Sequence, residues 1–378
     1  MKSSWARRLL LLMAILGGPS CGGYSGSGGG ALPVYSTPTA FMTTPVGVQH
    51  SVVPIDFTVT DAESDPFSMT VLFSTDGGVT FNPATPASGN GGLTGLPSSP
   101  GGTTHTFLWD SVADGVAAGT MNASLAIQTV GTVNPQVEIR ITPSDTALGT
   151  AGTTANFTVD NTFERTLGVA TAGFPHTLAA MGNSETALGD LVADAMRVTY
   201  GVQLAFQNGW GIRSPLPSSF LPANMLLRRP DVGYLPGPPY DLVQGDVYLM
   251  LPFGNKVVTR TVTGTQLWAV LEQGVSAYPA NNNGFPQISG FSFSFKASNP
   301  AGSRVLSVTR AGGGAIAKDS TTYTFATNDY LNAGGDSYAM LNDGQGVTEE
   351  ILAQAVADYI QTIGTISPTI AGRLTIVP

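Results

Sequence analysis

The pattern of hydrophobic and polar residues changes close to Asn161. Before this residue, short segments alternate apolar and polar residues at every second position, which is typical of half-buried β-strands. The clearest segments are residues 55–59, 68–73, 106–110 and 137–141, and Trp109 is expected in the core. About seven such segments, separated by turn clusters, predict an all-β sandwich over residues 33–161.

The second part of the chain alternates helices and strands. Apolar residues over 188–196 recur at helical spacing and predict a helix that Gly201 ends, followed by a buried strand over 202–207. Residues 267–275 have the spacing of a second helix, and residues 291–295 alternate as a half-buried strand does.

A last helix is predicted near the C-terminus. Thr348 is expected to cap it, with Glu349 and Glu350 in its first turn, where carboxylates meet the positive end of the helix dipole, and Gly364 at its end. Residues 162–378 are thus predicted to form an α+β domain. The expected fold class is a multidomain protein, an all-β sandwich followed by an α+β domain.

Composition supports strands and turns and excludes one class of partner. The 378 residues include 47 glycines, and the formal net charge is −9. Lysine and arginine are scattered along the chain, without the basic patch that a phosphate backbone requires. We therefore expect no nucleic-acid partner.

The first 21 residues have the layout of an export signal. Lys2, Arg7 and Arg8 precede an apolar run over residues 9–16 that is too short to span a bilayer. Cys21, the only cysteine, then stands where a bacterial lipobox has its lipid-modified residue. The stretch resembles such a lipobox, so we expect an exported protein of the bacterial cell envelope. Its lipid anchor at Cys21 would hold it on a membrane facing the periplasm or the cell surface.

The alternative for Cys21 is an ordinary signal peptide with a cysteine near its cleavage site. Residues 22–32 are rich in glycine and serine, as a flexible tether would be, and this favours the lipid anchor. Residues 1–21 are therefore assigned to the signal and 22–32 to the tether.

Residues 33–161 resemble immunoglobulin-like or fibronectin-type modules of bacterial surface proteins. Within them Asp61, Glu63 and Asp65 could offer carboxylates to Ca²⁺, which takes six to eight oxygen ligands. A polar turn between strands explains the same residues without an ion, and we favour that interpretation.

Four segments in the second half carry a more specific resemblance. In chain order they are residues 185–197 (ETALGDLVADAMR), residues 207–213 (QNGWGIR), residues 245–255 (GDVYLMLPFGN) and residues 326–336 (ATNDYLNAGGD). Together with residues 285–290 (FPQISG), they resemble the C-terminal substrate-recognition domain of 5'-nucleotidases, from about Phe163 to the end of the chain.

That resemblance implies a site for a nucleoside or nucleotide. Phe253 and Tyr330 match the two aromatic residues that hold the base, and Asp336 matches the carboxylate that accepts hydrogen bonds from the ribose hydroxyls. Arg213 matches a residue on the phosphate side, where a guanidinium suits phosphate oxygens. Asn208 and Asn255 match polar residues of the same pocket. The alternative is that the rings are ordinary core aromatics and that Arg213 pairs with a carboxylate.

The sequence departs from the family at three positions beside this site. Gly182 stands where the family commonly has a second phosphate-facing arginine, Trp210 replaces a small residue, and Ser337 replaces a glycine. Phosphate affinity is therefore in question, and the pocket could prefer a different ligand.

The family hydrolyses phosphate esters with two metal ions held by a separate N-terminal domain. Such a dinuclear site needs histidines in motifs such as Gly-Asn-His-Glu, and His50, His105 and His176 lie in none. Beyond the expected export signal, where Ser20 happens to fit the pattern, no serine lies in a Gly-x-Ser-x-Gly motif either. We expect no catalytic residue and no cofactor in this chain. The alternatives to simple ligand binding are an accessory role beside a separate metallophosphatase chain, or a surface or adhesion scaffold without a ligand.

Overall fold

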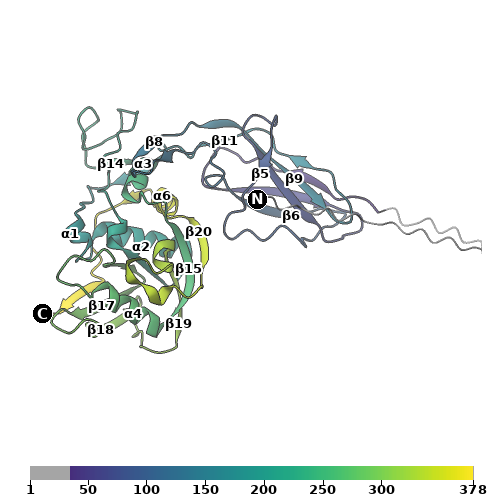
Figure 1. Cartoon of the computed structure of the whole chain (residues 1–378). Coiled ribbons are helices and arrows are strands. Elements are labelled where there is room, and N and C mark those ends of the chain that lie inside the picture. The colour runs from purple at the N-terminus through teal and green to yellow at the C-terminus, as the bar shows by residue number, and fades with distance from the viewer. Residues whose placement is uncertain (1–34, 378) are drawn as a thin grey trace, which may run out of the picture. The chain divides into compact units, whose positions relative to one another are not determined.

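The computed structural model describes residues 35–377 (Figure 1). The predicted signal and Cys21 lie outside the described residues. Residues Thr37–Pro378 make up one unit by their contacts. Among the helices of the described part, none has the length and apolar character needed to cross a membrane.

Residues 37–161, called here the β region, contain strands and no helix. The strands are β1 (Thr39–Met42), β2 (Val48–Gln49), β3 (Val52–Thr60), β4 (Ser68–Ser74), β5 (Asn82–Pro83), β6 (Thr103–Asp110), β7 (Thr120–Met121), β8 (Ile127–Thr129), β9 (Asn134–Ser144), β10 (Gly152–Thr153) and β11 (Phe157–Val159). One sheet has the order β1-β3-β6 and a second has the order β2-β11-β9-β4-β5, with β10 also pairing with β9. Strands β7 and β8 form a separate pair.

The predicted period of two explains how these sheets pack. Every second residue of β3 and β9 is buried, and so are Phe107 and Trp109 of β6. The buried side chains of both sheets belong to one hydrophobic cluster, in which Trp109 is fully buried. The core position predicted for Trp109 is therefore correct.

Residues 162–378, the C-terminal domain, mix helices and strands. The strands are β12 (Thr166–Ala170), β13 (Leu204–Asn208), β14 (Tyr240–Val243), β15 (Lys256–Thr263), β16 (Pro286–Ser289), β17 (Phe291–Lys296), β18 (Val305–Arg310), β19 (Thr322–Asn328), β20 (Val347–Ile351), β21 (Thr365–Ile366) and β22 (Leu374–Val377). The α-helices are α1 (Leu178–Met181), α2 (Ala187–Thr199), α3 (Gln244–Met250), α4 (Gly264–Gly274), α5 (Asp329–Asn332) and α6 (Leu352–Ile363). Three short 3₁₀ helices are η1 (Gly209–Gly211), η2 (Gly335–Ser337) and η3 (Ala339–Leu341).

A five-stranded sheet of order β16-β13-β19-β15-β20 forms the centre of this domain. Side chains on its two faces pack into two separate hydrophobic cores. Ala205 packs in the cluster that contains α2 and α6, whereas Leu204 and Phe206 pack in the cluster that contains α4. Two smaller sheets, β14-β12-β21 and β18-β17-β22, complete the domain. The mixed α and β architecture agrees with the sequence expectation.

Most predicted elements of this domain are present, and one prediction is wrong. Helices α2 and α4 and strands β13 and β17 lie where the periodicity places them, and Gly364 ends α6. Thr348, Glu349 and Glu350, however, belong to strand β20, and α6 begins only at Leu352. The reason is tertiary: the open edge of β15 pairs with β20, with Val258 opposite Thr348.

Segment 245–255 also supports a long loop. Asp246 is fully buried and accepts hydrogen bonds from the guanidinium of Arg229 and from the backbone and hydroxyl of Ser218. Arg229 also donates to the carbonyl of Phe220. A buried carboxylate is stable only when paired in this way, so the aspartate of this segment fixes the loop between η1 and β14.

Candidate functional site

The six residues predicted to bind a ligand line one cavity. This cavity has a volume of about 430 Å³ and is lined by Asn208, Trp210, Gly211, Arg213, Phe253, Asn255, Asn283, Tyr330 and Asp336. The volume is within the range of small-molecule sites. Residues that are up to 128 positions apart in sequence, such as Asn208 and Asp336, are thus brought into hydrogen-bonding contact.

Two parallel strands position this cavity. Strands β13 and β19 run side by side in the same direction, and Asn208 is the last residue of the first. Asn328 ends the second and caps helix α5, which carries Tyr330. Ligands of α/β sheets commonly bind where parallel strands end, because the chain leaves the sheet there and exposes polar groups.

Asp336 is held in a fixed orientation. One carboxylate oxygen accepts a hydrogen bond of 2.8 Å from the side-chain amide of Asn208, and the other accepts one of 3.0 Å from the hydroxyl of Tyr330. Its backbone has φ of 49° and ψ of 29°, the left-handed region that residues other than glycine rarely adopt. Such strain persists only where neighbouring contacts maintain it, and it is common at functional sites.

Tyr330 packs closely on the backbone of Gly335. A Cβ atom on Gly335 would lie 2.5 Å from Cε1 and Cζ of the Tyr330 ring, so only glycine allows this approach. The ring remains 46% exposed and lines the cavity. Gly335 thereby supports the tyrosine ring without covering it.

Phe253 and Arg213 form a second wall. The guanidinium carbon of Arg213 lies 5.8 Å from the centre of the Phe253 ring, which is 47% exposed. Within residues 35–377, the Arg213 side chain has no hydrogen bond and no ion pair, so its alternative role as a carboxylate partner does not apply here. The exposed ring and the exposed guanidinium both line the cavity, and this makes the pair a candidate binding wall.

The two asparagines differ in their freedom. Asn208 donates to Asp336 and accepts from the side chains of Gln207 and Asn328, so both ends of its amide are occupied. Asn255 donates to Asp329 at 2.9 Å. Asn208 therefore positions other groups, while the Asn255 carbonyl oxygen is oriented by that single contact.

Asn283 lines the cavity but was not predicted from the sequence. It follows two other asparagines in the loop before β16, and its carbonyl accepts a hydrogen bond from the backbone of Trp210. The run of three asparagines is a polar-loop signal that could have identified it.

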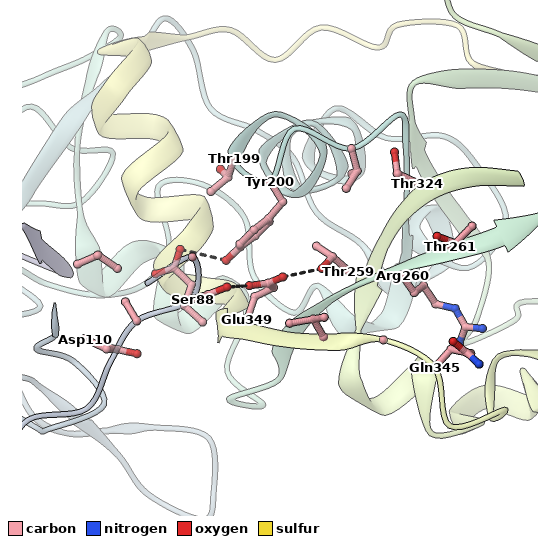
Figure 2. Close-up of a pocket in the computed structure, with 17 residues that line it drawn as sticks. Ser88, Asp110, Thr199, Tyr200, Thr259, Arg260, Thr261, Thr324, Gln345 and Glu349 are labelled. Atoms are coloured by element: carbon pink, nitrogen blue, oxygen red, sulfur yellow. Dashed lines mark hydrogen bonds between the residues drawn. The ribbon is translucent and has the colours of Figure 1, made fainter. Parts of the chain in front are cut away.

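A second, larger cavity lies where the β region meets the C-terminal domain (Figure 2). Its volume is about 770 Å³, and its lining includes Asp110, Glu349, Glu350 and Tyr200. Glu349 accepts hydrogen bonds from the hydroxyls of Ser88 and Thr259, and the hydroxyl of Tyr200 donates to Glu350 at 3.1 Å (Figure 2). Burial, together with the charge of Asp358, raises the pKa of Glu350 to about 8.

Beside this cavity, a buried polar network joins α6 to the β region. Arg165 donates to Asp358 at 3.0 Å and to Gln244 at 2.7 Å. The hydroxyl of Ser51, in the β region, donates to the same Asp358 carboxylate at 2.9 Å. Gln354 donates to both Ser51 and Asp358. The network links the two regions through one carboxylate oxygen of Asp358, which accepts from Ser51, Arg165 and Gln354.

In the acidic turn considered for Ca²⁺, part of the carboxylate capacity is used by internal hydrogen bonds. One oxygen of Asp61 accepts from the hydroxyl of Ser98 and from the backbone of Asp65. Over the described range 35–377, no three His, Cys, Asp or Glu side chains lie close enough together to share a metal ion.

Comparisons with known proteins extend these observations. Residues 166–343 match the family described as 5'-nucleotidase, C-terminal domain. Trifunctional nucleotide phosphoesterase protein YfkN of Bacillus subtilis (strain 168) is 29% identical over 200 residues, which is 50% of this chain and 12% of that protein. A 5'-nucleotidase-related protein of Glossina morsitans morsitans is 28% identical over 208 residues, or 52% of this chain and 35% of that protein.

A solved structure also overlaps this chain in part. The crystal structure of a 5'-nucleotidase precursor from Thermus thermophilus gives a TM-score of 0.47 at 24% identity, covering 69% of this chain and 54% of that one. The chain therefore matches only part of each of these longer proteins.

Proposed function

Since residues 166–343 are a 5'-nucleotidase C-terminal domain, we propose that this domain binds a nucleoside or nucleotide in the cavity between Phe253 and Tyr330. One observation carries the proposal. Six residues singled out from three separate sequence segments line the same cavity, although a core alone would not require both Arg213 and Asp336 at its surface.

Each group has a distinct role in this proposal. The base lies between the rings of Phe253 and Tyr330, where stacking contributes about 1 to 3 kcal/mol per ring. The Asp336 carboxylate accepts hydrogen bonds from two ribose hydroxyls, and Asn208 and the Tyr330 hydroxyl hold it in place. Arg213 lies on the side of the 5' substituent.

We further propose that the chain binds this ligand without hydrolysing it. The names of the relatives describe phosphoesterases and nucleotidases, but His50, His105 and His176 lie in no motif of a dinuclear centre. Residues 33–161 are proposed to be an immunoglobulin-like module, supported by two sheets with a shared core. With a lipid anchor at Cys21, the protein would be a nucleoside-binding component of the cell envelope.

Isothermal titration of the purified full chain with adenosine and AMP tests the binding. We expect both to bind and to raise the apparent stability in proportion to ln(1 + [L]/Kd). Phe253→Ala should weaken both ligands, whereas Phe41→Ala, which removes a ring of similar exposure from the β region, should change neither. If neither nucleosides nor nucleotides bind the wild-type chain, the proposal is wrong. Release of phosphate from AMP that survives removal of contaminating phosphatases would refute the non-catalytic part.

A further inference from the structure

Trp210 is a fixed wall of the cavity. It lies in η1, directly after β13, and its indole nitrogen donates a hydrogen bond of 2.9 Å to the carbonyl of Leu178. Its backbone N–H donates to the carbonyl of Asn283 at 3.0 Å. Because both its backbone and its ring are held, the indole borders the space between Phe253 and Tyr330 without filling it.

Gly182 lies directly against this indole. Its backbone has φ of −91° and ψ of −3°, a conformation open to any residue. A Cβ atom there would nevertheless lie 2.8 Å from the indole nitrogen of Trp210 and 3.3 Å from Cβ of Asn281. The same Cβ atom would lie 3.2 Å from the backbone carbonyl oxygen of Leu178, so the indole of Trp210 is the closest, though not the sole, obstacle to a side chain at position 182. A side chain at position 182 and the indole of Trp210 would therefore overlap in space.

The cavity has one positively and one negatively charged lining residue. Arg213 and Asp336 are its charged lining residues, so their charges cancel. Arg213 is exposed to solvent, and an exposed cation gains little from pairing with an anion. Gly182 does not line the cavity, and a Cβ atom at this position would meet the indole of Trp210, which does.

We infer that Trp210, together with Gly182, determines the specificity of the pocket: it excludes a second cation, so the pocket takes an uncharged nucleoside about as tightly as its phosphate monoester. This inference rests on the proposed nucleoside binding. The ligand class it names is an aromatic base with a neutral sugar, recognised by three aromatic residues and one carboxylate.

The test is a double-mutant cycle with Gly182→Arg, Trp210→Gly and the double variant. For each protein, the affinities for adenosine and AMP are measured by titration, and Tm is measured without ligand. In the wild type, the two affinities should differ by less than about fivefold. Gly182→Arg alone should lower Tm, because the arginine collides with the indole. Adding Trp210→Gly should recover part of that loss and should make AMP bind at least about tenfold more tightly than adenosine.

Trp210→Phe serves as the control, since it keeps a ring but no N–H, and it should retain the wild-type ligand preference. The inference is overturned if the wild-type protein binds AMP more than about tenfold more tightly than adenosine. It is also overturned if Gly182→Arg alone keeps the wild-type Tm and comes to prefer AMP. Additive effects of the two substitutions on Tm would overturn it as well. If the wild-type protein binds neither adenosine nor AMP, the proposed function itself is wrong, and the proposed selectivity no longer applies.

Discussion

The two cavities described above differ in how their polar groups are used. In the larger one, at the junction of the β region and the C-terminal domain, the lining residues Glu349 and Glu350 both accept hydrogen bonds from neighbouring side chains. In the smaller one, Arg213 has no polar side-chain partner among residues 35–377, and Phe253 and Tyr330 are about half exposed.

Volume is therefore a poor guide to function in this molecule. At the junction cavity, the carboxylate of Glu349 bonds to Ser88 of the β region and to Thr259 of the C-terminal domain, so it stabilises the contact. The smaller cavity presents groups whose interactions are incomplete in the free protein. Substitutions should accordingly change stability at the junction and affinity at the pocket.

Arg165→Ala should have the largest effect. It leaves the partly buried carboxylate of Asp358 without its cation, which costs about 3 kcal/mol in free energy of unfolding. Urea titration measures this loss, and adenosine affinity should not change. Arg228→Ala, which breaks a more exposed pair with Asp241, should cost less than about 1 kcal/mol. Equal losses of unfolding free energy in the two variants would show that burial does not strengthen the ion pair of Arg165.

Phe253→Ala and Tyr330→Ala should each weaken adenosine binding by about 1 to 3 kcal/mol, because a stacking face is lost. Their free energies of unfolding should stay close to that of the wild type, since both rings are half exposed. Titration calorimetry and urea denaturation on the same samples separate the two effects. Destabilisation without loss of affinity would show that the rings are structural.

Glu350 should make stability depend on pH. Its pKa is about 8 in the folded protein because of burial and the charge of Asp358, above that of an exposed glutamate. The folded state then holds a proton that the unfolded state has lost, so stability is full below the unfolded pKa and falls as pH rises towards 8, by about 1 kcal/mol per pH unit. Glu350→Gln should remove this slope when unfolding is compared at pH 6 and pH 8. Identical slopes for the two proteins would show that the carboxyl group titrates normally.

Arg213→Ala should have the smallest effect. One exposed guanidinium contributes less than about 1 kcal/mol to binding a phosphate, so AMP affinity should fall by less than about fivefold. Adenosine affinity should be unchanged. A much larger loss for AMP would mean that Arg213 is the main determinant of phosphate recognition.

The sequence predicted the elements whose periodicity is local. The alternation of β3 and β17 and the helical spacing of α2 are set by which face of each element is buried. Thr348 followed by two glutamates has the local chemistry of a helix start, yet it forms strand β20, because pairing with the edge of β15 outweighs capping. Local preference cannot reveal a partner 90 residues away, such as the Thr259 that donates to Glu349.

The pocket residues were predicted from the family resemblance. That they lie close together in the folded chain could not be derived from their spacing in the sequence. Asn208 and Asp336 meet because β13 and β19 end side by side, which only the sheet order determines. The contact between Gly182 and Trp210 was also out of reach, since each residue alone is only an isolated departure from the family pattern.

The contact between Gly182 and Trp210 also restricts the order in which mutations can accumulate. A residue with a Cβ atom at position 182 meets the indole at 2.8 Å, whereas a smaller residue at position 210 leaves only the longer contacts with Leu178 and Asn281. We therefore expect the order that changes position 210 first to cost less stability than the reverse order. The two positions are expected to change more readily in one order than in the other.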